Sequence, residues 1–202
     1  MTERPPTPFA TRPGGRSARV QQAVHRAVRD LEAAEGRAGL TVPAIAAAAG
    51  VTPSTVYRRW GDLATLLADV AVERLRPDGP PADHGGLRAD LAAWAEQFTE
   101  ELATPAGRRY LRDAVGGADP DDTPGAATTP STTAAHRCSD HAAAQLTAIG
   151  VRAAGRGEAV PSVESLLDTV VAPLVYRLLF RPDGLTPAYA HALVEAALRD
   201  HP

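Results

Sequence analysis

The sequence predicts an all-α protein, because its composition and the spacing of its apolar residues both favour helices. Alanine, which has the highest helix propensity, occurs 41 times among 202 residues, whereas aromatic residues make up only 4%. Apolar side chains recur at intervals of three and four residues, and no segment shows the alternation of a half-buried strand. The pattern predicts about nine helices and no internal repeat.

The first four helices are predicted from an apolar stripe, capping residues and prolines. Residues 1–15 are rich in Pro, Gly and Arg, so we expect a disordered arm before the first helix. The stripe from Val20 to Leu31 predicts that helix, and Gly36 ends it. Three residues suited to N-cap positions predict the starts of the next helices: Thr41, Thr52 and Asp62. We expect these helices to end near Gly50, near Arg59 and before Arg76.

Five further helices are expected after a Pro- and Gly-rich linker over residues 77–86. Helical spacing of apolar side chains places them over residues 87–103, 105–115, 132–154, 163–179 and 187–199. Residues 116–130 have the composition of a mobile loop. Pro173 lies inside the eighth helix and should kink it or cost one backbone hydrogen bond.

Composition and charge limit the possible function classes. The single Cys138 excludes an internal disulfide framework. No apolar run approaches the roughly 20 residues that span a bilayer, and the N-terminus lacks the apolar core of a secretory signal. We therefore expect a soluble, cytoplasmic protein with no membrane partner. Residues 1–76 carry 11 Arg against 7 acidic residues, whereas residues 77–202 carry 10 Arg against 17, and this asymmetry suits a nucleic-acid reader attached to another domain.

Residues 40–67 have the pattern of a helix-turn-helix. A capped helix of about eight residues meets a turn that contains Gly50, and a second short helix follows with polar residues on one side. Hydroxyl groups suit DNA phosphates, and Arg can bind guanine with two hydrogen bonds. The residues expected to project toward DNA are Thr52, Pro53, Ser54, Thr55, Tyr57, Arg58 and Arg59, with Arg16 and Arg19 upstream.

The segment from Ala18 to about Leu67 resembles the DNA-binding domain of the TetR family of bacterial transcriptional regulators. The matching stretches are Leu40-Thr41-Val42, Ile45-Ala46, Ala49-Gly50-Val51, Ser54-Thr55-Val56-Tyr57-Arg58-Arg59-Trp60 and Leu66-Leu67. The resemblance implies that Thr41 caps the second helix and touches phosphate, and that Tyr57 makes the family's usual phosphate contact. It also implies that Arg58 contacts a base or phosphate, while Trp60 packs the turn or lies against the backbone.

The sequence departs from the family at one position of this segment. Leu63 stands where the family commonly has a Lys, so one phosphate contact is expected to be missing. Arg59 or an N-terminal Arg is expected to replace it. The loss of a single phosphate contact lowers the salt dependence of binding by about one unit and does not abolish binding.

The rest of the chain resembles the family's regulatory domain through its helix count and the stretch Ala172–Phe180, which looks like a dimerisation helix. Residues 16–76 are therefore expected to bind DNA, and residues 77–202 to bind an effector and dimerise. The candidate effector-pocket residues are Trp94, Phe98, Tyr110, His141 and Leu174. For the aromatic side chains among them, simple core packing is the alternative. The candidate dimer-interface residues are Leu167, Val171, Val175, Leu178, Leu193 and Ala197.

The predicted function is that of a ligand-responsive repressor in the nucleoid. It would bind a palindromic double-stranded operator as a homodimer and be released by a small molecule. One alternative is a DNA-binding or architectural protein without a ligand, and another is a small all-α enzyme. The sequence contains no Gly-rich phosphate loop, nucleophile elbow or HExxH motif, so we expect neither an enzyme nor a cofactor. We expect no metal site either, since His136 and His141 are five residues apart, about 140° around a helix.

Overall fold

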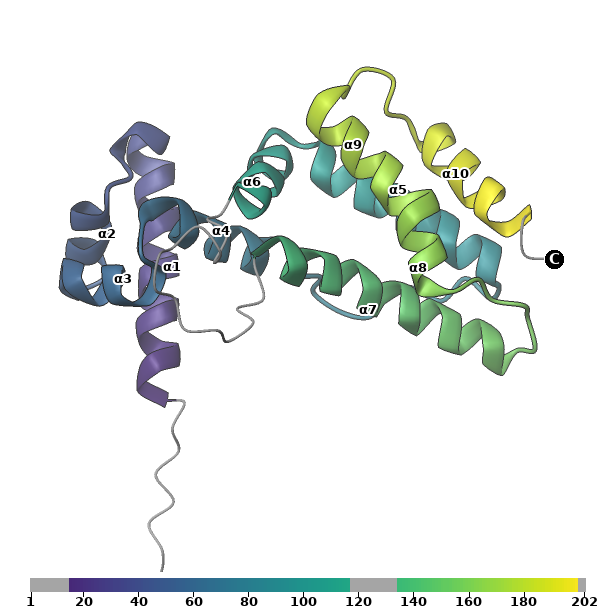
Figure 1. The fold of residues 1–202 in the computed structure, drawn as a ribbon, viewed down its shortest axis with the longest axis horizontal. Helices are drawn as coiled ribbons and strands as arrows, with labels where there is room; N and C mark the ends of the chain where they lie inside the picture. The colour runs from purple at the N-terminus through teal and green to yellow at the C-terminus, as the bar shows by residue number, and fades with distance from the viewer. Residues whose placement is uncertain (1–14, 117–133, 200–202) are drawn as a thin grey trace, which may run out of the picture. The chain divides into compact units, whose positions relative to one another are not determined.

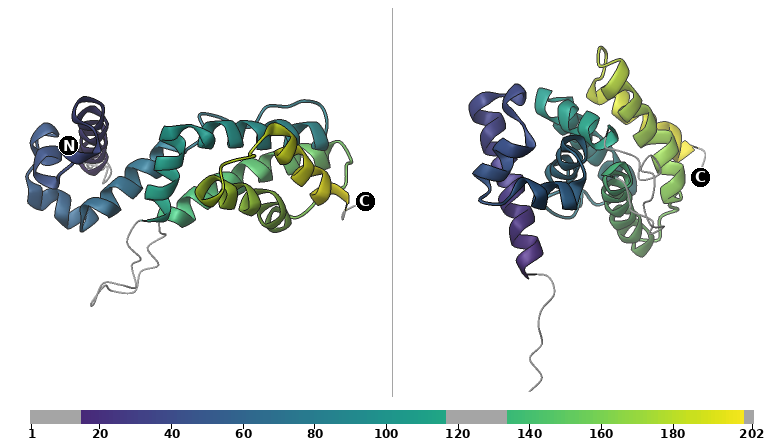
Figure 2. Two further views of the ribbon diagram at one scale, coloured as in Figure 1. Left: turned by 90° about the horizontal axis from the view of Figure 1, so that it is seen from above. Right: turned by 60° about the vertical axis from the view of Figure 1, so that its left-hand side comes forward.

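The computed structural model describes residues 15–116 and 134–199, and this part of the chain consists of helices and connecting segments (Figures 1 and 2). The predicted N-terminal arm up to residue 14 and the predicted loop from residue 117 lie outside it. Nine α-helices are found when α8 to α9 are counted as one, so the all-α prediction is confirmed for the described residues. None of these helices is both long and apolar enough to cross a membrane.

The chain divides into two compact units, one ending at Leu63 and the other beginning at Ala64. The first unit contains four elements: α1 (Gly15–Glu35), the 3₁₀ turn η1 (Arg37–Gly39), α2 (Val42–Ala48) and α3 (Pro53–Trp60). Its most deeply buried side chains include Val24 and Val28 of α1, Ile45 of α2 and Val56 of α3. These side chains follow the apolar spacing of the sequence, so the first unit packs α1, α2 and α3 around a small aliphatic core.

Local signals set the ends of α2 and α3. The Thr41 hydroxyl accepts a hydrogen bond from the Ala44 N–H at 3.3 Å, which confirms the predicted N-cap of α2. The turn after α2 contains Gly50 at φ 67°, a backbone conformation that favours glycine. Gly61, at φ 77°, follows the last residue of α3 in the same way.

The second unit is larger and contains the remaining helices. They are α4 (Leu63–Arg74, whose first residue closes the first unit), α5 (Leu87–Ala103), α6 (Pro105–Val115), α7 (Ala134–Gly155), α8 (Val163–Leu166), η3 (Leu167–Val171), α9 (Ala172–Phe180) and α10 (Pro187–Arg199). The main core joins Leu91 and Trp94 of α5, Ile149 of α7, Leu174 of α9 and Val194 of α10. The helix α10 packs along α5 (Figure 1), so these two helices bury each other's apolar faces.

The helix predicted over residues 163–179 is continuous, but its hydrogen-bond pattern changes before Pro173. The segment η3 is π-helical, and the N–H of Ala172 bonds to the carbonyl of Leu167, five residues earlier. Because proline has no N–H and crowds the carbonyl four residues before it, the ordinary pattern cannot continue through this position. A turn of π-helix accommodates Pro173 within the helix.

Candidate nucleic-acid interface

The helix α3 has one buried side and one exposed side. Val56 and Trp60, four residues apart, face the core of the first unit. Thr52, Pro53, Ser54, Tyr57 and Arg58 are exposed, and the Tyr57 side chain retains 50% of its accessible surface. A helix that presents hydroxyl groups and a guanidinium on its outer side carries the donors and acceptors that DNA phosphates and base edges require.

The first turn of α3 carries a cluster of three hydroxyl groups. Thr52 stands at the N-cap position, but its side chain accepts no hydrogen bond from a helix N–H, so the predicted side-chain cap is wrong. Instead, Thr52 Oγ1 lies 2.9 Å from both Ser54 Oγ and Thr55 Oγ1. These short contacts satisfy the hydroxyl locally and leave a compact polar surface at the start of the helix.

Two candidate DNA contacts on α3 are engaged within the protein. Trp60 is only 6% exposed and its ring lies 6.2 Å from that of the buried His25 on α1, which agrees with the expectation that it packs the turn and excludes its ring from a direct DNA contact. Arg59 is exposed, but its guanidinium bonds to Ser17 and Gln21 of α1. The sequence around Tyr57 and Arg58 does not indicate that Arg59 bonds to Ser17 and Gln21 of α1.

The other candidate DNA contacts lie on α1 and at the start of α2. Arg19 is exposed on α1, and its Nε donates to the Gly15 carbonyl at 3.0 Å. Thr41 is exposed while it caps α2, and Leu63, in the place of the family's Lys, is half-buried. The side chain of Arg16 lies outside the described part of the structure.

The five predicted effector-pocket residues do not gather in one place. Trp94 and Phe98 stack with their ring centroids 5.2 Å apart, and the buried Leu174 belongs to the same core. Tyr110 instead packs against a separate small cluster formed by Ala71, Val72 and Ala114. Core packing thus accounts for Trp94, Phe98 and Leu174, whereas Tyr110 and His141 belong to the region where α4, α6 and α7 meet.

His141 on α7 has an unusual environment. Its Nδ1 atom is buried and has no hydrogen-bond partner among the described residues. Burial lowers the pKa of His141, and the positive charges of Arg76 and Arg137 lower it further. A neutral imidazole with an unused buried nitrogen can give or receive one more hydrogen bond.

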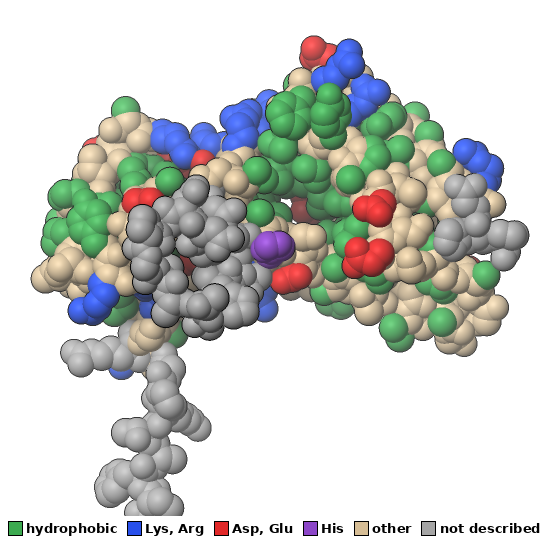
Figure 3. Space-filling view, viewed as in Figure 1, with side chains coloured by type: hydrophobic (Ala, Val, Ile, Leu, Met, Phe, Trp, Pro, Cys, Tyr) green, Lys and Arg blue, Asp and Glu red, His purple; other side chains and the backbone are tan. Residues whose placement is uncertain are grey.

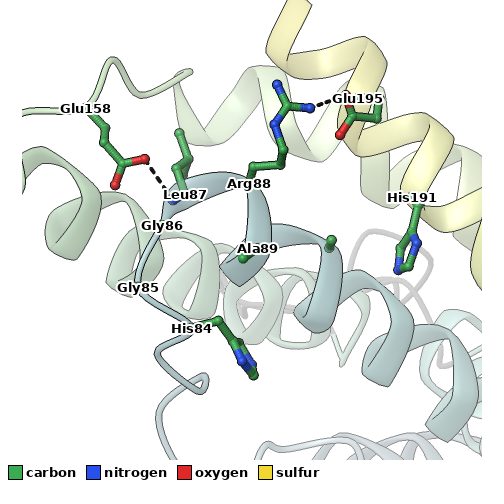
Figure 4. A pocket seen from close by; sticks show the side chains of 10 residues that line it. His84, Gly85, Gly86, Leu87, Arg88, Ala89, Glu158, His191 and Glu195 are labelled. Carbon is green, nitrogen blue, oxygen red and sulfur yellow. Dashed lines mark hydrogen bonds and ion pairs between the residues drawn. The ribbon is translucent and has the colours of Figure 1, made fainter.

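A surface pocket of about 540 Å³ lies elsewhere, between the start of α5 and α10 (Figure 4). Its charged side chains are paired: Arg88 with Glu195, and His191 Nε2 with Glu96 Oε2 at 3.2 Å. Glu158 Oε2 accepts the Leu87 N–H at 2.9 Å (Figure 4). None of the five predicted effector residues lines this pocket, which forms between the predicted linker, the start of the helix that follows it and the predicted last helix.

A buried carboxylate beside this pocket is another feature that the sequence pattern did not indicate. Asp90, in the first turn of α5, is only 1% exposed and accepts the His84 N–H at 2.6 Å. Arg156, which directly follows α7, and Arg152 of α7 approach its Oδ2 atom at 3.2 and 3.5 Å. Arg152 also donates to the carbonyls of Pro81 and Ala82, both at 2.6 Å, so the connection before α5 is fastened to α7.

The predicted dimer-interface residues differ widely in exposure. Leu178 and Ala197 are 1% and 2% exposed within their own chain, so their assignment to an interface is wrong: they belong to the core. Leu167, Val171, Val175 and Leu193 are half-buried. The large exposed hydrophobic residues of α9 are Tyr176 and Phe180, which retain 55% and 69% of their surface and have ring centroids 5.2 Å apart. Figure 3 shows hydrophobic side chains gathered over this end of α9.

The stretch His136-Arg137-Cys138-Ser139-Asp140-His141 lies on α7. Among the described residues, no three His, Cys, Asp or Glu side chains are grouped so that they could hold a metal ion. Arg137 of this stretch instead bonds to Asp69 of α4 at 2.7 Å, and burial raises the pKa of the Cys138 thiol. Through the bond between Arg137 and Asp69, this stretch connects α7 to α4.

Known proteins resemble this chain in both fold and sequence. A TetR transcriptional regulator from Agrobacterium tumefaciens superposes with a TM-score of 0.53 at 22% identity, covering 90% of this chain and 94% of that protein. A TetR-family regulator from Mesorhizobium loti has the same TM-score at 19% identity, with coverages of 93% and 98%. At these identities the two structures support the fold alone.

Curated relatives match only part of the chain. The HTH-type transcriptional regulator AqdR of Rhodococcus erythropolis is 35% identical over 75 residues, which is 37% of this chain and 36% of AqdR. The uncharacterized HTH-type transcriptional regulator Mb1581 of Mycobacterium bovis is 40% identical over 63 residues, 31% of either chain. The chain thus covers about a third of the length of these relatives.

Two sequence families match most of the chain. Residues 26–70 match the family described as bacterial regulatory proteins, tetR family. Residues 81–197 match the family described as tetracyclin repressor-like, C-terminal domain, and this match alone spans more than half of the 202 residues. With a helix-turn-helix whose outer side is polar and a second, all-helical unit that matches the regulatory domain, the chain belongs to the TetR family of DNA-binding transcriptional regulators.

Proposed function

We propose that this chain is a repressor that binds a palindromic operator as a homodimer and is released by a small-molecule effector. Family membership establishes that it is a DNA-binding transcriptional regulator and not an enzyme. The observation that carries the proposal is the exposed polar side of α3, opposite the buried Val56 and Trp60. That side fits the major groove as a recognition helix does.

The exposure of each side chain on α3 indicates the DNA contact that we propose for it. Tyr57 and the hydroxyl groups of Thr52, Ser54 and Thr55 contact phosphates, which fixes the helix on the duplex. Arg58 points outward beside Tyr57 and reads a base or contacts phosphate. Thr41 and Arg19 add phosphate contacts from α2 and α1.

Dimerisation is proposed through the outer faces of α9 and α10. The exposed Tyr176 and Phe180 are large apolar groups that water disfavours, and a second copy of the chain would cover them. Leu167, Val171, Val175 and Leu193 are half-buried and would lie at the edge of this surface. Two-fold symmetry then places two recognition helices about 34 Å apart on a palindromic site.

The effector site is proposed where α4, α6 and α7 meet, beside Tyr110 and His141. The unused Nδ1 of His141 supports this location, because a polar group of a ligand would complete its hydrogen bonding. Arg137 of the same helix is bonded to Asp69 of α4, so a ligand that moves α7 would also act on α4. The coupling between effector and operator need be only about 1–3 kcal/mol to regulate binding.

Selection of genomic DNA fragments by the purified protein at two salt concentrations tests operator recognition. We expect a palindrome to be recovered by the wild type and lost with the Tyr57→Phe, Arg58→Ala double variant. Arg26→Ala is the control, because it removes one exposed positive charge from α1 without touching α3. Weak, sequence-independent binding by all three proteins would refute the proposed operator recognition.

A ligand screen by thermal shift tests the effector site. Compounds that stabilise the wild type are re-tested on His141→Ala and on His191→Ala, which removes the corresponding ring from the pocket beside α10. We expect only His141→Ala to lose the stabilisation, and these compounds to release the protein from its operator. Loss in His191→Ala instead would move the site to the pocket of Figure 4.

A further inference from the structure

We propose that Arg59 is a positioning residue for DNA binding: it braces the end of α3 against α1 and thereby holds Arg19 ready for a phosphate contact. The proposal rests on the DNA face described above. It assigns Arg59 a role within the protein, in place of the direct DNA contact that its position in the motif suggested.

The brace joins the last turn of α3 to the first turns of α1. Arg59 Nη1 donates to Ser17 Oγ at 2.6 Å and to the Ser17 carbonyl at 3.2 Å. Arg59 Nη2 donates to Gln21 Oε1 at 2.5 Å. Ser17 and Gln21 are four residues apart, so both lie on the same face of α1. A planar guanidinium presents several donors in fixed directions and can bridge two such acceptors, whereas the Lys ammonium is a flexible point charge.

A buried contact beside the brace joins the same two helices. The Trp60 ring lies 6.2 Å from the ring of His25, and both residues are buried. The Arg59 guanidinium carbon lies 5.1 Å from the centroid of the Trp60 ring, within the range of a cation–π contact. The aromatic contact fixes the middle of α1 against α3, and the Arg59 hydrogen bonds extend this attachment to the start of α1.

Arg19 is the residue that the brace positions. Arg19 stands between Ser17 and Gln21 in sequence, but residues two positions apart on a helix point to different faces, so its side chain leaves α1 away from the brace. Its Nε bonds to the Gly15 carbonyl at 3.0 Å, and the brace fixes this part of α1 against α3, so the backbone of Arg19 is fixed relative to α3. A cation on a helix end that is fixed in place loses less conformational freedom when it meets a phosphate than a cation on a loose segment.

The test uses two variants that weaken the brace without changing the formal charge: Gln21→Ala removes the bond from Arg59 Nη2 and leaves the two bonds to Ser17, and Arg59→Lys removes the planar guanidinium. Binding is measured over a range of salt concentrations, on the duplex that the wild-type protein enriches most from a random-sequence library. We expect both variants to bind about threefold to tenfold more weakly. We also expect the slope of log K against log salt to fall by about 0.9, the value of one phosphate contact, although no charge has been removed.

Three further variants make the test specific. Gln22→Ala is the matched control, since it removes the same side chain from the next, exposed position of α1, and we expect wild-type binding. Arg19→Ala should lower the slope of log K against log salt when it is introduced alone, but it should cause no further decrease when it is combined with Gln21→Ala. Arg59→Ala should match Arg59→Lys. Thermal unfolding is recorded for each variant, and Arg59→Lys decides the question if Gln21→Ala does not fold.

Two results would overturn the proposal. Wild-type binding by Arg59→Lys, with the slope lowered only in Arg59→Ala, would make Arg59 a direct phosphate contact. An unchanged slope in both Gln21→Ala and Arg59→Lys would show that the hydrogen bonds of Arg59 do not position Arg19. If no duplex is enriched, the operator proposal fails, and the same titration on the unselected duplex pool still tests the brace.

Discussion

The replacement Asp90→Asn tests how much one buried carboxylate contributes to the stability of the second unit. The side chain of Asp90 is inaccessible to solvent and accepts the His84 N–H at 2.6 Å. Arg156 and Arg152 supply positive charge at 3.2 and 3.5 Å. Asn preserves the size of the side chain and one acceptor oxygen, but it removes the charge that both guanidinium groups face.

The magnitude follows from these partners. Breaking a buried ion pair by removing one member costs about 3–5 kcal/mol, because the other charge is left uncompensated. Here Arg152 keeps two hydrogen-bond acceptors, the Pro81 and Ala82 carbonyls, and Arg156 keeps the carboxylate of Glu158, so both guanidinium groups retain partners. We therefore expect the smaller loss of about 2 kcal/mol in the free energy of unfolding, below the range for a stranded charge.

The stability lost in Asp90→Asn should also depend on pH. Burial by itself raises the pKa of Asp90, but the His84 N–H bond and the charges of Arg156 and Arg152 outweigh it, so the pKa lies below its ordinary value. A carboxyl with a lowered pKa in the folded state stabilises the protein above its unfolded pKa of about 3.9. This contribution is lost as the pH falls through the folded pKa, so the difference between wild type and Asp90→Asn should disappear in that range.

Urea unfolding at a fixed protein concentration, at neutral pH and through the acid range, measures both effects. The control is Asp83→Asn, because Asp83 also pairs with Arg156 but its side chain is 55% exposed, and we expect it to cost only a few tenths of a kcal/mol. The reasoning is refuted if the two variants lose equal stability, or if the Asp90→Asn loss persists unchanged below the folded pKa.

Three other predictions address the core, the DNA face and the dimer. Leu174→Ala should lower the free energy of unfolding by about 2–5 kcal/mol, since Leu174 is fully buried, and a loss below 1 kcal/mol in urea unfolding would contradict its place in the core. Tyr57→Phe should weaken operator binding about threefold to tenfold by removing one exposed hydroxyl, and gel-shift titration with an unchanged midpoint of thermal unfolding separates this loss from misfolding. Tyr176→Ser with Phe180→Ser should shift the protein toward monomer in sedimentation, whereas Val151→Ser, at an equally exposed apolar position of α7, should not; equal effects would argue against an α9 interface.

Local sequence signals were sufficient for the helices and for the polar side of α3. Helix formation depends on residues three and four positions apart and on caps within one turn, all of which lie in a short window of sequence. Thr41 bonds to Ala44 as its position predicted, and Val56 and Trp60 turn inward while Tyr57 and Arg58 remain exposed. The resemblance to the TetR family rests on the same short segment.

Apolar periodicity could not decide which residues of the C-terminal helices remain at the surface. Leu178 and Tyr176 lie two positions apart on α9, yet Leu178 is buried within the chain and Tyr176 is exposed. A stripe identifies the side of a helix that avoids water, but not whether the same chain or a second copy covers it. Apolar periodicity also could not distinguish residues that line an opening from residues that fill the core, and Trp94 and Leu174, which were predicted to line a pocket, belong to the core.

The sequence by itself determined the all-helical class, the order of the helices and the outward side of α3, because each depends on neighbours within a few residues. Only the tertiary structure decided that Arg59 reaches Ser17, 42 residues away, and that Arg156 reaches Asp90, 66 residues away. An Arg side chain can pair with any accessible acceptor within its length, and which acceptor comes within reach is set by the packing of whole helices. The brace on α1 and the fastening of the α4–α5 connection to α7 are therefore properties of the folded chain.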